Sequence, residues 1–231
     1  MLGARVQLHW AAQIPTGVGR TLIAHRPDDS NTAFRWSAER EGLMQEPVNG
    51  IEAGIRLRDL TLLANDEELP LRGRTLDEGF AFLESRFGGK LNRPNVGLPD
   101  HPVAHGARFD AGADDLAALA GYYAHAAMLL ESVKDSPVRC WPHHFDIATL
   151  HILGEGKTIG IGLSPGDDGI REPYWYVNLF PYPHPSRLQP LRFGMWYTEG
   201  WTGAVLPAAK GPQYAEFFVR EATEHCRALL A

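Results

Sequence analysis

Two runs of short strand-like segments, each preceded and followed by a helix-like segment, constrain the fold of this chain most strongly. The order helix, several strands, helix occurs once and then again, without visible sequence identity between the halves. Strands and helices do not alternate one by one, as a doubly wound parallel sheet requires. The sequence therefore predicts an α+β fold of antiparallel sheets with packed helices, in two similar helix–strands–helix halves.

The first half opens with a segment whose apolar residues are spaced as on one face of a helix. Apolar side chains recur at every fourth position, at Leu2, Val6, Trp10 and Ile14. Pro15 and Gly17 are expected to end this helix. His9 and Gln13 lie on a neighbouring row, and two interpretations stay open for them: a solvated flank of a core helix, or part of a ligand-binding site.

An antiparallel meander is predicted next. Its strand-like segments, bounded by turn residues, cover residues 32–36, 42–48, 55–62 and 69–71. A helix then begins after Thr75, because Thr75 and Glu78 form a T-x-x-E capping box. Its apolar stripe continues to Phe87, and the glycines that follow are expected to terminate it.

Residues 89–112 are rich in Pro, Gly, Asn and His and form the best internal boundary. We predict a single compact domain over residues 1–231, with pseudo-halves 1–90 and 111–231 joined by the loop 89–112. Asp114 and Asp115 favour the N-terminus of a long helix through its dipole. Strands are predicted over residues 139–153, 158–163, 174–180, 193–197 and 202–206, and a last helix is expected to begin near Pro212.

Charge and composition exclude several classes of protein. The chain carries 28 acidic and 22 basic residues, a net charge of −6, and no Lys/Arg run, which argues against a nucleic-acid partner. Residues 116–130, the longest apolar stretch, are shorter than the ~20 residues of a membrane helix. Cys140 and Cys226 form no CxxC pattern and are expected to be buried free thiols, with a disulfide left open. We predict a cytoplasmic protein with no membrane partner and leave its oligomeric state open.

Two motifs resemble catalytic signatures, but the residues and predicted elements around them do not fit those signatures. Residues 162–166 match G-x-S-x-G, but a turn and a strand are predicted after Ser164, where the nucleophile elbow needs a helix. Pro165 also lacks the backbone N–H that an oxyanion hole requires. Residues 156–158 match the last positions of the phosphate-binding loop motif, but the glycine that begins this motif is missing. Neither motif therefore supports a function.

A histidine-rich segment is the stronger candidate for chemistry. Strand alternation over residues 141–146 predicts that His144 and Asp146 share one face. The pair has three open interpretations: a structural contact, an acid–base site, or a divalent metal site. Metal ligands beyond the pair would come from His9, His25, Glu172 or Glu199, none at a fixed spacing to the pair. No cofactor other than this possible metal is indicated.

Aromatic residues crowd the region from Tyr174 to Trp201; Glu172 lies just before this region and Glu199 near its end. Alternation places Trp175 opposite Tyr174 and Tyr176, so one face belongs to the core. The other face lines a pocket or extends the aromatic core. The candidate ligand-binding residues are His9, Gln13, Trp141, Tyr174, Tyr176 and Trp201. The candidate catalytic residues are His144, Asp146, Glu172 and Glu199.

Several segments, in this order, resemble a bacterial family of unknown function. They are Leu8-His9-Trp10 with Gln13, Ser136-Pro137-Val138, His144-Phe145-Asp146-Ile147-Ala148 and Glu172-Pro173-Tyr174-Trp175-Tyr176. The resemblance covers most of the chain and implies no activity. Asp146 matches the family pattern, whereas distant members carry other residues at the positions of His143 and His144, which weakens the metal interpretation.

Three functions follow as hypotheses. The first is a binding module for a small polar or aromatic ligand, because the aromatic and polar strands carry no complete catalytic motif. The second is a hydrolase-type enzyme, metal-assisted or not, that uses Asp146 with His144 and a glutamate. The third is a structural or partner-binding protein. The sequence leaves the identity of any ligand or substrate open.

Overall fold

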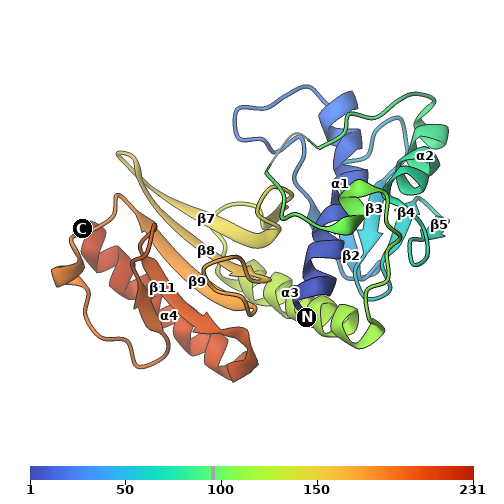
Figure 1. Cartoon of the computed structure of the whole chain (residues 1–231). Helices are drawn as coiled ribbons and strands as arrows, with labels where there is room; N and C mark the ends of the chain where they lie inside the picture. The colour runs from blue at the N-terminus through green and yellow to red at the C-terminus, as the bar shows by residue number, and fades with distance from the viewer. Residues whose placement is uncertain (95–96) are drawn as a thin grey trace. The chain divides into compact units, whose positions relative to one another are not determined.

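The computed structural model describes residues 1–94 and 97–231 and divides them into two compact units. Unit 1 comprises Met1–Ala124 and Arg139–Phe145, and unit 2 comprises His125–Val138 and Asp146–Ala231. Within these described residues the chain has four α-helices and two antiparallel sheets, of five and six strands. The α+β class and the helix–strands–helix order of both halves are confirmed (Figure 1). The single compact domain stays a prediction.

Unit 1 is built on a five-stranded meander with strand order β1-β2-β3-β4-β5. Helices α1 and α2 pack against each other, α1 against β3 and α2 against β4 (Figure 1). The elements of this part are α1 (Leu2–Leu22), β1 (Arg35–Ser37), β2 (Gly42–Met44), β3 (Ala53–Arg56), β4 (Thr61–Ala64), β5 (Glu67–Pro70), α2 (Leu76–Phe87), the 3₁₀ turn η1 (Pro102–His105) and β6 (Arg139–Trp141).

Helix α1 does not end at Pro15, and that prediction is wrong. The helix continues to Leu22, and most of its residues are buried. A proline inside a helix removes one backbone hydrogen bond at a cost of about 3 kcal/mol, which burial of the α1 stripe can offset. The hydroxyl of Thr16 adds a bond to the carbonyl of Ala12 at 2.8 Å. The solvated flank is also wrong, because His9 and Gln13 are buried.

The strand predicted over residues 55–62 is wrong, because it is two strands joined by a turn at residues 57–60. Leu57 and Leu60 are fully buried within this turn, and Leu60 adopts a positive φ of 56°. A buried turn keeps the apolar pattern of a strand, so alternation alone does not reveal it. The predicted meander is nevertheless confirmed.

Helix α2 follows the sequence rules closely. The hydroxyl of Thr75 accepts from the backbone N–H of Glu78, and the carboxylate of Glu78 accepts from the N–H of Thr75, which confirms the capping box. Gly88 ends the helix in the left-handed conformation. Gly79 faces α1, where an added Cβ would lie 2.5 Å from Ile14.

Unit 2 packs helices against an antiparallel sheet. Its strands follow the order β10-β11-β9-β8-β7, and α4 packs on β8, β9 and β11 (Figure 1). The elements are the part of α3 (Ala113–Val133) from His125 onward, β7 (Asp146–Gly154), β8 (Lys157–Ser164), β9 (Tyr174–Phe180), η2 (Pro185–Arg187), β10 (Met195–Tyr197), β11 (Gly203–Pro207), η3 (Ala208–Lys210) and α4 (Pro212–Leu230). Trp175 and Phe218 are among its fully buried side chains.

The strand predicted over residues 139–153 is interrupted. A turn at residues 142–145 separates β6 from β7, and Phe145 adopts a positive φ of 58°. His143 and His144 therefore lie in a turn, and the strand alternation that would place His144 beside Asp146 does not apply to them. Both cysteines are buried free thiols, and burial raises the pKa of the Cys226 thiol to about 12.

Among the described residues, α3 is the one helix long and apolar enough to cross a membrane, by length and composition alone. Its apolar window has 44% of its residues buried within the protein. The core helix of a soluble protein passes the same test. The cytoplasmic location stays a prediction.

Candidate functional site

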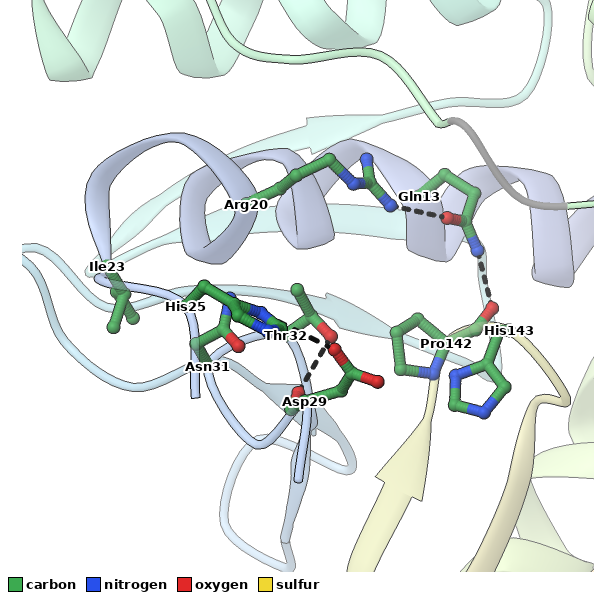
Figure 2. A pocket seen from close by; sticks show the side chains of 9 residues that line it. All are labelled: Gln13, Arg20, Ile23, His25, Asp29, Asn31, Thr32, Pro142 and His143. Atoms are coloured by element: carbon green, nitrogen blue, oxygen red, sulfur yellow. Dashed lines mark hydrogen bonds and ion pairs between the residues drawn. The ribbon is translucent and has the colours of Figure 1, made fainter. Parts of the chain in front are cut away.

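A polar cavity of about 580 Å³ lies in unit 1, at the C-terminal half of α1 (Figure 2). Its walls come from α1, from the loop that follows α1, and from the turn that follows β6. The lining residues are Gln13, Arg20, Ile23, His25, Asp29, Asn31, Thr32, Pro142 and His143. This volume lies within the range of about 300–1,000 Å³ that is usual for small-molecule sites.

The loop after α1 is shaped by short polar side chains that bond to their own backbone. The carboxylate of Asp28 accepts from the N–H of Ser30 at 3.1 Å, and the side-chain oxygen of Asn31 accepts from the N–H of Arg26 at 3.2 Å. The N–H and hydroxyl of Thr32 both donate to the carbonyl of Asp29, at 3.0 Å each. These Asx and ST turns fix the loop in one conformation.

Close packing holds this loop against α1. An added Cβ at Gly19 would lie 2.1 Å from the carbonyl oxygen of Asn31, so the position accepts only glycine without movement of the backbone. From the sheet side, the buried amide of Gln45 donates to the carbonyls of Thr32 and Ala33, at 2.8 and 3.3 Å. The loop wall of the cavity is therefore supported from two sides.

The opposite wall is the turn after β6, and two side chains of α1 hold it. The carbonyl of Pro142 accepts from Nε2 of His9 at 2.8 Å and from Nε2 of Gln13 at 2.7 Å. His9 also stacks on Phe145, with ring centroids 5.2 Å apart. The hydroxyl of Tyr123 donates to the carbonyl of Phe145. These bonds keep Pro142 and His143 at the edge of the cavity, as Figure 2 shows.

His9 supports the cavity as a neutral imidazole. Its pKa is lowered from 6.5 to about 4, mainly by burial and to a smaller extent by the electrostatic influence of Arg5, His144 and His143. The hydrogen bond to Pro142 acts in the opposite direction. Because a carbonyl can only accept, the proton of the neutral ring must be on Nε2.

Arg20 is the cationic group of the cavity. Its guanidinium reaches along α1 toward Gln13 and donates to the side-chain oxygen of Gln13 at 3.3 Å and to the carbonyl of Asn92 at 3.2 Å (Figure 2). Both partners are neutral. Within the part of the chain that the structure describes, no carboxylate forms an ion pair with Arg20, and burial lowers the pKa of its half-buried guanidinium. The group still carries its charge at neutral pH, since arginine ionises far above it.

Asp29 and His25 form the outer wall. The Nδ1 atom of His25 lies 3.6 Å from a carboxylate oxygen of Asp29, and both side chains are exposed. The described residues that line the cavity include the hydroxyl of Thr32 and the carboxylate of Asp29, and no serine or cysteine. The arrangement offers charge, hydrogen bonds and the apolar surfaces of Ile23 and Pro142, which is the chemistry of recognition.

The candidate ligand-binding residues fall into two groups. In unit 1, Gln13 lines the cavity, His9 lies behind the wall, and Trp141 ends β6 beside it, with its ring centroid 6.2 Å from that of His143. The sequence-based set therefore found two of the residues that build this cavity. The remaining members belong to unit 2.

In unit 2, the aromatic candidates form a cluster on one face of the sheet. Tyr176 packs edge-on against Trp201 and beside Tyr174, with centroids 6.3 and 6.4 Å apart. The hydroxyl of Tyr176 donates to Asp146, and that of Tyr174 donates to Asp167 at 2.6 Å. Trp175 points to the opposite, buried face, as alternation predicts.

The other candidate catalytic residues are exposed. His144 lies in the turn after β6, Glu172 in the loop before β9, and Glu199 in the loop between β10 and β11. Within residues 1–94 and 97–231, no group of three His, Cys, Asp or Glu side chains is placed to hold a metal ion. The catalytic role of these residues stays a prediction.

Sequence reasoning missed Arg20, Asn31 and Thr32, and considered His25 only as a metal ligand. Arg20 was missed because the helix was expected to end at Pro15, which removes Arg20 from the face that carries Gln13. Its spacing of seven residues from Gln13 would place both on one helix face, had the helix been extended.

A second hollow, also of about 580 Å³, lies in unit 2 between α3 and α4. Its buried lining is mainly apolar, with Leu129, Ile161 and Val219 at the wall. None of the candidate site residues lines it.

No family model, curated protein or solved structure matches this chain. The resemblance to a bacterial family of unknown function therefore stays a prediction.

Proposed function

We propose that unit 1 is a binding module for a small polar molecule, which occupies the cavity at the C-terminal half of α1. The observation that carries this proposal is the cavity itself. It has the volume of a small-molecule site, and polar groups from two stretches far apart in the sequence, residues 13–32 and 142–143, converge on it.

The rigidity of the walls supports the proposal. Binding is costly when a site must become ordered around its ligand. Here the loop is held by Gln45 and by contact with Gly19, and the turn is held by His9 and Gln13. The cavity is thus formed before any ligand arrives.

The hydrolase hypothesis gains no comparable support. Asp146 is engaged by Tyr176, while Glu172 and Glu199 extend into solvent from separate loops. A general acid and a general base must each lie within hydrogen-bond reach of the group whose proton they transfer, in one shared site. Binding is therefore the function that the described residues favour.

A pair of neighbouring tryptophan substitutions tests the proposal. Ile23 lines the cavity, whereas the adjacent Leu22 is 41% exposed and does not. A library of small polar metabolites is screened by thermal shift against the unmodified protein, and hits are measured by calorimetry. We expect Ile23→Trp to weaken the hits about tenfold or more by filling the cavity, and Leu22→Trp to leave them unchanged.

Two results would overturn the proposal. One is a library in which no compound binds. The other is a set of hits that bind Ile23→Trp and Leu22→Trp with equal affinity, because the ligand would then lie outside the cavity.

A further inference from the structure

We propose that the ligand of this cavity is a carboxylate monoanion, held through its two oxygens by the guanidinium of Arg20. This inference rests on the proposed function and names the chemical class that the cavity selects. It follows from the surroundings of Arg20, whose positive charge is not paired with a carboxylate among the described residues.

Arg20 differs from other arginines of unit 1 in its partners. Arg26 pairs with Glu46 at 2.8 Å, Arg56 pairs with Asp59 and Glu68 at 2.9 and 2.7 Å, and Arg58 pairs with Glu41 at 2.7 Å. Arg20 is half-buried, yet its acceptors among the residues that the structure describes are the neutral oxygens of Gln13 and Asn92.

A partly desolvated cation gains most from an anion that replaces its lost water. The guanidinium carries five N–H groups, and two hydrogen bonds leave donors for a ligand. Its planar fork matches the two oxygens of a carboxylate. The neighbouring amide of Gln13 orients the fork, since it accepts from Arg20 while it donates to Pro142.

The remaining charges of the lining favour one negative charge over two. Arg20 is the only arginine or lysine among the described lining residues, and Asp29 adds a carboxylate at the outer wall. A phosphate dianion would bring two negative charges to one cation in a cavity that already holds the carboxylate of Asp29, whereas a monoanion brings one, which Arg20 can neutralise. Ile23 and Pro142 offer apolar contact for the carbon skeleton of the acid.

Two sets of probes, each matched in size, test the inference: benzoate, benzamide and benzamidine, which differ in charge, and the smaller pair lactate and lactamide. Each is titrated into isotope-labelled protein, and the Nε–H signals of the arginines and the backbone amides are followed by NMR. We expect at least one carboxylate to move the Arg20 Nε–H signal and to bind about tenfold more tightly than its own amide. Inorganic phosphate, titrated in parallel, is expected to bind more weakly than that carboxylate.

Two arginine variants localise the effect. Arg20→Gln is expected to abolish the preference for carboxylate over amide, whereas Arg26→Gln, a neighbour outside the cavity, is expected to keep it. Arg20 also anchors the wall, so the measurement on unmodified protein stands by itself if Arg20→Gln does not fold.

Failure of the inference is distinct from failure of the proposed function. Amides or benzamidine that bind in the cavity as tightly as the carboxylates would overturn the inference and leave the binding module in place. Phosphate that binds more tightly than every carboxylate would overturn it too. If no probe moves a cavity signal, the inference fails, and the metabolite library alone decides the proposed function.

Discussion

Single buried polar residues determine the shape of the cavity in unit 1. Gln13, His9 and Gln45 are buried, and each donates to a backbone carbonyl of a wall. A buried donor that loses its partner costs about 1–3 kcal/mol, so these contacts define one conformation.

The neutral state of His9 makes the stability of the protein depend on pH. Its pKa is about 4 in the folded state and 6.5 in the unfolded state. Between these values the unfolded chain binds the extra proton, so stability is full above pH 6.5 and is lost as the pH falls toward 4. The loss attributable to His9 is about 2 kcal/mol between about pH 7.5 and about pH 5.

Urea unfolding of the native protein and of His9→Gln at both pH values measures this loss. The glutamine amide can still donate to Pro142 but does not titrate. Between the two pH values, we expect the free energy of unfolding to fall by about 2 kcal/mol less in the variant than in the native protein. Parallel pH profiles would show that His9 does not titrate as described.

The sequence revealed some site residues and hid others for identifiable reasons. Gln13 and His9 stood out because polar side chains interrupt an apolar helix. The acceptor of both is Pro142, which lies 129 residues from Gln13, and no local pattern can indicate such a pairing. The aromatic residues of β9 stood out by density, and their alternation was predictable because a strand has period two.

At the scale of elements, local and long-range forces separate the correct predictions from the wrong ones. Helix α2 was predictable because its capping box and terminal glycine act within a few residues. Helix α1 was not, since burial of most of its residues, on both sides of Pro15, overrides the local cost of that proline. The turn at residues 142–145 was also hidden, because contacts from α1 and from Tyr123 hold it.

Two glycine-to-alanine substitutions in helices test how closely the loop packs on α1. Alanine normally stabilises a helix interior by up to about 1 kcal/mol relative to glycine. Gly121 of α3 has no neighbour within 4 Å of an added Cβ, so Gly121→Ala is expected to show this gain. Gly19→Ala places its Cβ 2.1 Å from the carbonyl of Asn31 and is expected to cost about 1–3 kcal/mol instead.

Chemical denaturation of both variants provides the comparison. If Gly19→Ala is as stable as Gly121→Ala, then the loop does not press on α1, and this wall of the cavity is not preformed.

At the scale of the whole molecule, the polar cavity and the aromatic cluster belong to different units. The cavity with Arg20 and Gln13 lies in unit 1, and the cluster of Tyr174, Tyr176 and Trp201 lies in unit 2. The sequence pointed to both without ranking them, because polarity and aromatic density are visible in sequence while concavity is not.

A map of backbone amide shifts, recorded by NMR as the tightest compound of the metabolite screen is added, tests the central claim most directly. Binding in the cavity predicts that the largest shifts fall on residues of its lining, such as Arg20, Asn31 and His143. The amides of the aromatic cluster in β9 are then expected to stay unchanged. Shifts centred on Tyr174 and Tyr176, with the lining of the cavity unaffected, would contradict the claim.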